Sequence, residues 1–434
     1  MKKLFLLVVI VLTFNACVET RREKTKDDNF SERTLSENRK QFKQDLIQKT
    51  IHETLQKELN DSTAPEWMEA LWGIGFSGYR SAETRAALEH AFVHIDKRSF
   101  IFQRAFLETI YTVYQDSFVN EMEMFADKTK EPKLFAMAVN YLLLNNNNRA
   151  EYYLKMMDEK FPEWQQNPIL FMLQLRLSSE FDSQISKRPP LADLLNHDFR
   201  GKPVVFSFQR HDRRFPGLAV IRKADGSFVK DSSGQIFAIK QLAMALSNMP
   251  GYITNGNTPQ GILSMQGFAY SQNVFIGPSL TLQLVLPYEA SPDTFFHQYS
   301  GVKTPWSSDL YKEILPLSWQ EYMPIYEAFY AGKAGRTEII AHGTTADPEF
   351  YAGATYYPFT PSLGCLTAYE LWDDQSGRTQ ISHQKKLTKE LQKEGDGHGY
   401  LVVVELDDQQ KPVELWDVEK DIIATENEFN KKSM

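Results

Sequence analysis

The chain has 434 residues, of which 42% are hydrophobic and 24% are charged, and its formal net charge is −8. This length predicts two or three domains, and the composition lets each bury a sizeable core. The acidic balance argues against nucleic acid as a partner, because phosphate binding needs clustered Lys and Arg side chains. No internal run of about 18 or more apolar residues occurs, so no internal membrane span is expected.

The N-terminus predicts an export signal over residues 1–16. Lys2 and Lys3 precede an apolar stretch from Leu4 to Phe14, which is too short for a stop-transfer helix. The stretch ends in Phe14-Asn15-Ala16-Cys17, which resembles a bacterial lipobox, although an aliphatic residue usually stands where Phe14 is.

We therefore expect cleavage before Cys17 and lipidation of its thiol. The protein would then be a lipoprotein anchored in a membrane by this lipid at the periplasmic face, with the outer membrane favoured. The alternative is an ordinary signal peptide in which Cys17 has no role. Residues 17–37 are polar and charged and are expected to form a tether.

Residues 38–190 are predicted to be all-α. Apolar residues recur every three to five positions between charged ones, which is typical of helices with one buried stripe. Turns are expected at Gly78, at the Asn145–Asn148 run and at Phe161-Pro162. The helices would form either a solenoid-like array or a bundle. Both would offer a surface to a protein partner and neither would carry chemistry.

Residues 200–408 are predicted to form a mostly-β domain with helical insertions, so the chain as a whole is expected to be an α+β multidomain protein. The segment 287–336 would be an insertion, either a lid over a cleft or helices packed on the sheet, and residues 409–434 a C-terminal tail. Strands are expected at 203–208, 218–221, 274–276, 280–286, 337–340 and 400–406, and helices at 236–249, 317–331 and 385–392.

The chain has only two cysteines, Cys17 and Cys365. If Cys17 carries lipid, no internal disulfide can form, and Cys365 is a free thiol in an oxidising compartment. Such a thiol is either buried as a structural residue or used in chemistry. A neutral thiol is a weak nucleophile, so a reactive Cys365 would need a base nearby.

Three segments of the second half supply candidate partners: Thr258-Pro259-Gln260-Gly261, His342-Gly343-Thr344 and Ser362-Leu363-Gly364-Cys365. His342 follows a predicted strand, where its side chain would project into a cleft as the base, and Gly343 would allow a close turn. We expect the backbone N–H groups of Leu363, Gly364 and Cys365 to form an oxyanion hole.

The order and spacing of these segments resemble the catalytic domain of L,D-transpeptidases, with its YkuD-type fold. The resemblance implies that Cys365 is the nucleophile and that His342 is the base, oriented by a backbone carbonyl. It implies peptidoglycan stem peptides as substrate and a thioester at Cys365. The acyl group would pass to an amine in crosslinking or to water in trimming, with no cofactor and no metal.

Neighbouring side chains complete the predicted site. Ser362 and Thr344 would bind substrate or hold the site by hydrogen bonds. Tyr356 and Tyr357 would line the substrate site or merely pack in the loop between base and nucleophile.

The chain departs from the family pattern at two positions. Leu363 stands where His or Arg is common, and Thr367 stands where Arg is common. These departures leave open a non-catalytic lipoprotein that binds peptidoglycan or serves as a scaffold. His398 or His383 is an alternative partner for the thiol. A zinc peptidase is disfavoured, because the sequence has no H-E-x-x-H or comparable ligand pair.

Overall fold

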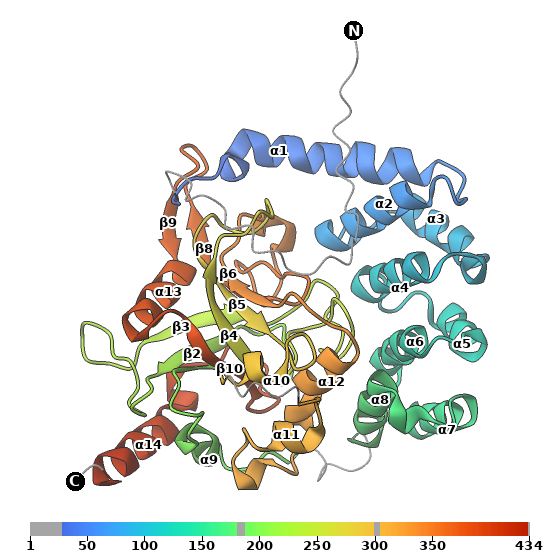
Figure 1. Cartoon of the computed structure of the whole chain (residues 1–434). Coiled ribbons are helices and arrows are strands. Elements are labelled where there is room, and N and C mark those ends of the chain that lie inside the picture. The colour runs from blue at the N-terminus through green and yellow to red at the C-terminus, as the bar shows by residue number, and fades with distance from the viewer. Residues whose placement is uncertain (1–27, 180–186, 299–303, 433–434) are drawn as a thin grey trace.

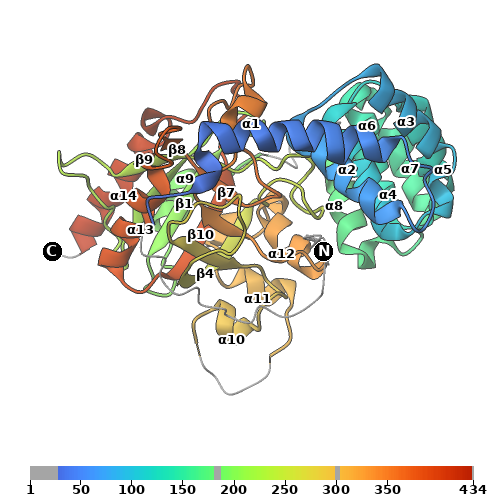
Figure 2. The same ribbon diagram turned by 90° about the horizontal axis from the view of Figure 1, so that it is seen from above.

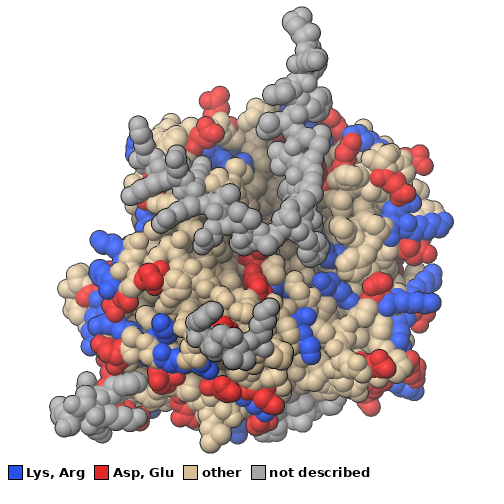
Figure 3. Space-filling view, viewed as in Figure 1, with Lys and Arg blue, Asp and Glu red and all other residues tan. Residues whose placement is uncertain are grey.

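The computed structural model describes residues 28–179, 187–298 and 304–432. The predicted signal peptide, Cys17 and most of the predicted tether therefore lie outside the described residues. The predicted α+β class is confirmed, with a helical half beside a β-rich half (Figure 1). Basic and acidic side chains are interspersed on the face seen in Figure 3, so the described residues form no continuous basic patch there.

The helical half is a two-layered array. Figure 1 shows α2, α4, α6 and α8 as a row facing the β-rich half, with α3, α5 and α7 outside it. Gly78, at φ 63°, ends the second helix as the sequence predicted, and a capping box at Ser81 starts the third. Of the two predicted arrangements, a solenoid-like array or a bundle, the helices form the solenoid-like array. The helices are α1 (Ser36–Asp45), α2 (Ala64–Ser77), α3 (Ala82–Phe92), α4 (Phe100–Val113), α5 (Val119–Lys128), α6 (Pro132–Asn145), α7 (Ala150–Lys160) and α8 (Pro168–Ser179).

The second half is built on a closed barrel, which the sequence pattern did not predict. Its strands run in the order β1-β10-β4-β5-β6-β7-β3-β2, and the pairs β1–β10 and β6–β7 are parallel. Every strand contributes at least one apolar side chain to the interior, which Leu387 and Leu391 of α13 (His383–Glu394) close. The strands are β1 (Val204–Gln209), β2 (Gly217–Arg222), β3 (Ala238–Leu242), β4 (Gly261–Ala269), β5 (Thr281–Val285), β6 (Ile340–His342), β7 (Leu366–Ala368) and β10 (His398–Glu405).

Three local predictions in this half were wrong. The strand expected at 337–340 begins only at Ile340 and runs to His342 as β6. The expected helix at 236–249 contains β3, because pairing with β2 and β7 and burial of Ile239 in the barrel outweigh the helix-forming composition. The expected strand at 274–276 forms only a single bridge, between Ile276 and Thr344.

The described parts of residues 287–336 and 409–434 pack on the barrel, mostly in a second apolar cluster outside its interior. The first segment holds α10 (Pro292–Phe295), α11 (Ser308–Lys312) and α12 (Glu327–Lys333), and Trp319 is fully buried. The helices of this segment are therefore packed on the sheet and do not form the alternative, a lid over a cleft. The second segment is not a free tail, because Val413 and Ile422 are fully buried and α14 (Glu419–Lys432) packs against α9 (Leu191–Asn196).

The last part of the predicted tether is also docked. Phe30 pairs with Arg378 beside the hairpin of β8 (Glu370–Trp372) and β9 (Thr379–Ser382), and Thr34 is fully buried. The prediction of a tether to residue 37 is therefore wrong from Asp28 onward. From this hairpin, α1 runs across to the helical array (Figure 2).

The two halves share one hydrophobic core through the loop of residues 249–258. Met249, Tyr252 and Ile253 belong to the same apolar cluster as the array helices. Asn140 of α6 donates a hydrogen bond to the Tyr252 hydroxyl at 2.9 Å, and Asn255 donates to the Glu108 carboxylate of α4 at 3.1 Å. The array therefore holds a loop of the second half directly. In the described parts of the chain, no helix is long and apolar enough to cross a membrane.

Phe76 tests this shared core. It is 5% exposed, and its ring lies 5.1 Å from that of Phe275 and 5.2 Å from that of Phe350, both of the β-rich half. We expect Phe76→Ala to lower the free energy of unfolding by about 3–5 kcal/mol. The control Phe100→Ala, at a residue 40% exposed, should cost below ~1 kcal/mol. Urea unfolding followed by circular dichroism measures both, and equal losses would contradict the shared core.

Candidate active site

The strand register places His342 and Cys365 on neighbouring strands. Ala341 pairs with Leu366, and both enter the barrel interior, so His342 and its partner Thr367 face outward. Cys365 directly precedes β7. Strand spacing and rise then separate the Cα atoms of His342 and Cys365 by roughly 8 Å. The structure thus brings the predicted base and nucleophile to one outer edge of the barrel.

His342 is held as a neutral imidazole. Its Nδ1 lies 2.7 Å from the carbonyl oxygen of Gly343, and that oxygen also accepts the N–H of Gly277 at 2.8 Å. A proton on Nδ1 leaves Nε2 as the acceptor. Burial lowers the pKa of His342 to about 4. The ring is therefore uncharged at neutral pH, as a general base requires, and a backbone carbonyl orients it.

Gly343 has a steric role beside this imidazole. A Cβ there would lie 2.2 Å from Oε1 of Glu370, a buried carboxyl group in β8. Glu370 also accepts a hydrogen bond from the Ser382 hydroxyl at 2.8 Å, and burial raises its pKa to about 8. The sequence did not single out Glu370.

Cys365 is a free thiol that is protonated at rest. The residue is partly exposed, so it is not a core cysteine, and Sγ lies 3.6 Å from the carbonyl oxygen of Glu338. Desolvation by the surrounding protein atoms raises the pKa of Cys365 to about 11, and a hydrogen bond from the Ile340 backbone and the nearby Arg336 charge oppose this rise only in part. Among the described contacts there is no hydrogen bond between this thiol and His342. The two must approach, or be bridged by water, before a proton moves.

The turn before Cys365 is closed by Ser362. Its hydroxyl accepts the N–H of Gly364 at 3.0 Å and donates to the carbonyl oxygen of Cys365 at 2.8 Å. The N–H of Gly364 is therefore engaged, and its predicted place in an oxyanion hole is wrong. In the described structure, no turn or side-chain hydrogen bond engages the N–H groups of Leu363 and Cys365, which remain candidates for this role.

Arg336 joins this turn to the 249–258 loop, and the sequence did not reveal it. The guanidinium is buried and donates to the carbonyl oxygens of Asn257 at 2.8 Å and Gly256 at 2.7 Å. It also reaches Gly364 O, which accepts the Thr258 hydroxyl at 3.0 Å. Gly364 has φ 111°, and a Cβ there would lie 2.1 Å from Nη2 of Arg336. The carbonyls of Gly251 and Ile253 complete the set of acceptors.

The remaining predicted substrate residues have other contacts. Thr344 is buried, accepts the Thr360 hydroxyl at 2.8 Å and accepts the Trp372 indole N–H on its carbonyl. Tyr356 packs on Tyr351, and the exposed Tyr357 donates to Glu349 at 2.8 Å. These contacts favour loop packing for Tyr356 and Tyr357.

The alternative histidines do not meet Cys365. His398 begins β10, which lies four strands from β7 on either way round the barrel, and it pairs with Asp396 at 2.8 Å. His383 packs its ring against Tyr369 at the start of α13. Within the described residues, no group of three His, Cys, Asp or Glu side chains is arranged to hold a metal ion.

Comparison with family models, with curated proteins and with solved structures gives no match for this chain.

The thiol environment predicts an unusual pH dependence. Between pH 7 and 10, alkylation of Cys365 by iodoacetamide should quicken about tenfold per pH unit, because a thiol of pKa about 11 gains thiolate throughout this range. Site-resolved mass spectrometry measures the rate at Cys365. In the same chain unfolded in urea, the rate should level off near the ordinary thiol pKa of about 8.5. Levelling of the folded protein's rate below pH 9 would refute the desolvated thiol.

Proposed function

We propose that the protein is a cell-wall enzyme similar to L,D-transpeptidases, with residues 200–408 as its YkuD-type catalytic region. It acts on peptidoglycan stem peptides through an acyl-enzyme at Cys365. The observation that carries the proposal is the convergence of all three sequence segments on one turn: Thr258 binds Gly364, Ser362 closes the turn, and His342 lies on the adjacent strand.

The reaction follows from the states of the two groups. The neutral imidazole of His342 takes the thiol proton as Cys365 Sγ attacks a peptide carbonyl, and the proton then passes to the departing amine. A thioester links the acyl group to Cys365. An amine attacks it to give a crosslink, or water attacks it to give a trimmed peptide, and the thiol regains its proton. The N–H groups of Leu363 and Cys365 would stabilise the oxyanion.

A non-catalytic peptidoglycan-binding or scaffold protein is the second candidate. Three observations favour it: the high pKa of the thiol, the lack of a described thiol–imidazole hydrogen bond, and the engaged N–H of Gly364. Against it, a partly exposed cysteine and a neutral, carbonyl-oriented imidazole on adjacent strands are groups that acyl transfer uses and that binding alone does not need.

The proposed location is the periplasmic face of a bacterial membrane, with a lipid on Cys17 as anchor. Because the described chain is docked from Asp28 onward, the linker between lipid and folded protein would be short. The helical array would act mainly by holding the 249–258 loop, and its outer layer is left for a protein partner.

Acyl-enzyme formation is the direct test. Wild-type protein mixed with muropeptides should gain mass, and Cys365→Ala should abolish the gain, since the thioester needs Sγ. His342→Ala should slow it about 10²–10⁴-fold, the usual contribution of a general base. Intact-protein mass spectrometry measures the adduct over time.

His94→Ala is the matched control, since His94 is exposed in the helical half, and it should acylate at the wild-type rate. An absence of both adduct and released product in the wild type would favour the binding protein. An adduct that survives Cys365→Ala would assign the chemistry to another residue.

A further inference from the structure

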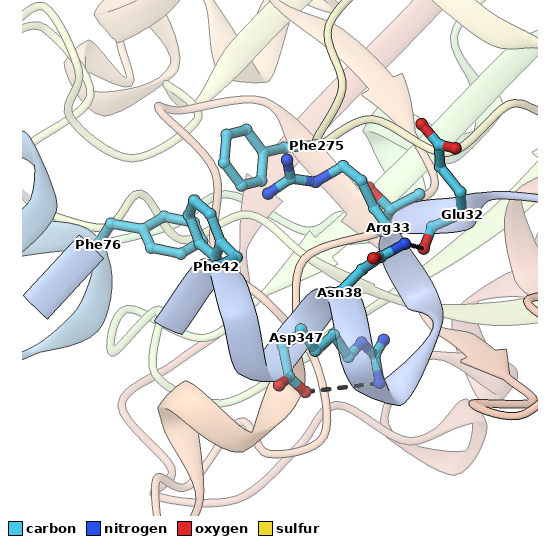
Figure 4. Close-up of a pocket in the computed structure, with 9 residues that line it drawn as sticks. Glu32, Arg33, Asn38, Phe42, Phe76, Phe275 and Asp347 are labelled. Atoms are coloured by element: carbon cyan, nitrogen blue, oxygen red, sulfur yellow. Dashed lines mark hydrogen bonds and ion pairs between the residues drawn. The ribbon is translucent and has the colours of Figure 1, made fainter. Parts of the chain in front are cut away.

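A pocket of about 300 Å³ lies where the two halves meet (Figure 4). Its volume is at the lower end for ligand sites, enough for a group of amino-acid size. None of the predicted site residues lines it. The lining residues come from the docked N-terminal segment and α1, from the array, and from the loops that bridge at Thr344: Glu32, Arg33, Asn38, Arg39, Phe42, Phe76, Phe275, Thr345 and Asp347.

Arg33 is the distinctive group in this pocket. Its guanidinium lies 4.1 Å from the ring centre of Phe275 and 4.7 Å from that of Phe42. No carboxylate of the described residues pairs with it. Burial lowers the pKa of Arg33, and no neighbouring carboxylate opposes this. A partly desolvated guanidinium whose N–H groups have no hydrogen-bond partner among the described residues suits a planar anion that it can bind with two parallel hydrogen bonds.

The other charges limit the ligand to a single carboxylate. Arg39 lies 3.5 Å from Asp347, so these two charges largely offset each other. Nε of Arg39 is buried and has no partner in the described structure. Glu32 is exposed and points away from the rings (Figure 4). The lining is thus close to neutral, which fits one carboxylate better than a doubly charged phosphate, and three phenylalanine rings offer apolar contact to the adjoining aliphatic carbons.

The pocket is joined to the candidate active site through the backbone. Thr345 follows the His342-Gly343-Thr344 segment, and its N–H donates to the carbonyl oxygen of Phe275 at 2.9 Å. Two residues on, Gly277 holds the carbonyl that orients His342. A ligand seated against Phe275 and Thr345 therefore lies beside the strand that carries the base.

We propose that this pocket binds a free carboxylate of a stem peptide and anchors the substrate for the chemistry at Cys365. The proposal rests on the proposed function, because that function makes stem peptides, which carry free carboxylates, the substrate. Arg33 would be the primary contact, while Asn38 stands at the rim.

Binding should be measured by calorimetry on Cys365→Ala protein, which cannot turn substrate over. The probes are a disaccharide tetrapeptide and the same compound with its carboxyl groups converted to amides. We expect the amide to bind at least tenfold more weakly. Arg33→Gln should weaken the acid probe to a similar extent, because it removes the guanidinium. The matched control Arg85→Gln removes an exposed guanidinium that pairs with Glu89 on α3, and it should leave binding unchanged.

Asn38→Asp is a second variant that tests the pocket if Arg33→Gln fails to fold. Asn38 is exposed in the first turn of α1, where an acidic side chain suits the helix dipole and offsets the loss of the hydrogen bond from the Asn38 amide to the Glu32 carbonyl, so this variant should fold and still repel the acid probe. Equal binding of acid and amide probes, no binding of either, or equal effects of Arg33→Gln and Arg85→Gln would overturn the proposal. If the wild type forms a Cys365 adduct but the pocket variants bind the probe normally, the proposed role of the pocket is wrong and the proposed enzyme stands. If binding depends on Arg33 but the wild type forms no adduct, the pocket binds the carboxylate and the proposed enzymatic activity is wrong.

Discussion

The buried guanidinium of Arg336 is the constraint on which the candidate active site depends. It donates to carbonyls of the 249–258 loop and to that of Gly364, the residue before Cys365. Each such charge-assisted hydrogen bond contributes about 1.5–3 kcal/mol. Burial lowers the pKa of Arg336 to about 10, so it stays charged at neutral pH, supported by the charge of Glu327. Glu327 in turn accepts the N–H groups of Tyr252 and Gln260, so the loop is held on both flanks.

The helical array contacts the candidate active site indirectly, through the 249–258 loop. The array binds the outer side of the 249–258 loop through Asn140, Lys133 and Glu108. Arg336 binds the carbonyls of the same loop, and Thr258 at its end meets Gly364. Movement of the array would therefore reach the turn before Cys365 through one short segment. The array is thus part of the structure that shapes the site and is more than a scaffold for partners.

The sequence carried enough information to predict the helical half and to single out the residues of the turn before Cys365. Helical periodicity is a local signal, and Ser-x-Gly-Cys is a short motif. It did not reveal barrel closure, because β1 and β10 pair across most of the second half. It missed β3, where pairing with two strands overrides helix propensity. The role of Arg336 could not be predicted, because its partners are backbone carbonyls, which every residue has whatever its side chain. The oxyanion prediction failed at Gly364 because Ser362 reaches back to its N–H.

Acylation by a carbapenem tests most directly whether the geometry of this turn serves chemistry, since L,D-transpeptidases are a family that such compounds acylate. The comparison is between Gly364→Ala and Gly353→Ala. Both glycines have positive φ, 111° and 88°, but an added Cβ meets Arg336 only at Gly364, and at Gly353 it meets nothing within 4 Å. Intact-mass kinetics should show one adduct, at Cys365, with Gly353→Ala near the wild-type rate and Gly364→Ala far slower. No adduct in the wild type, or equal rates in the two variants, would contradict the account.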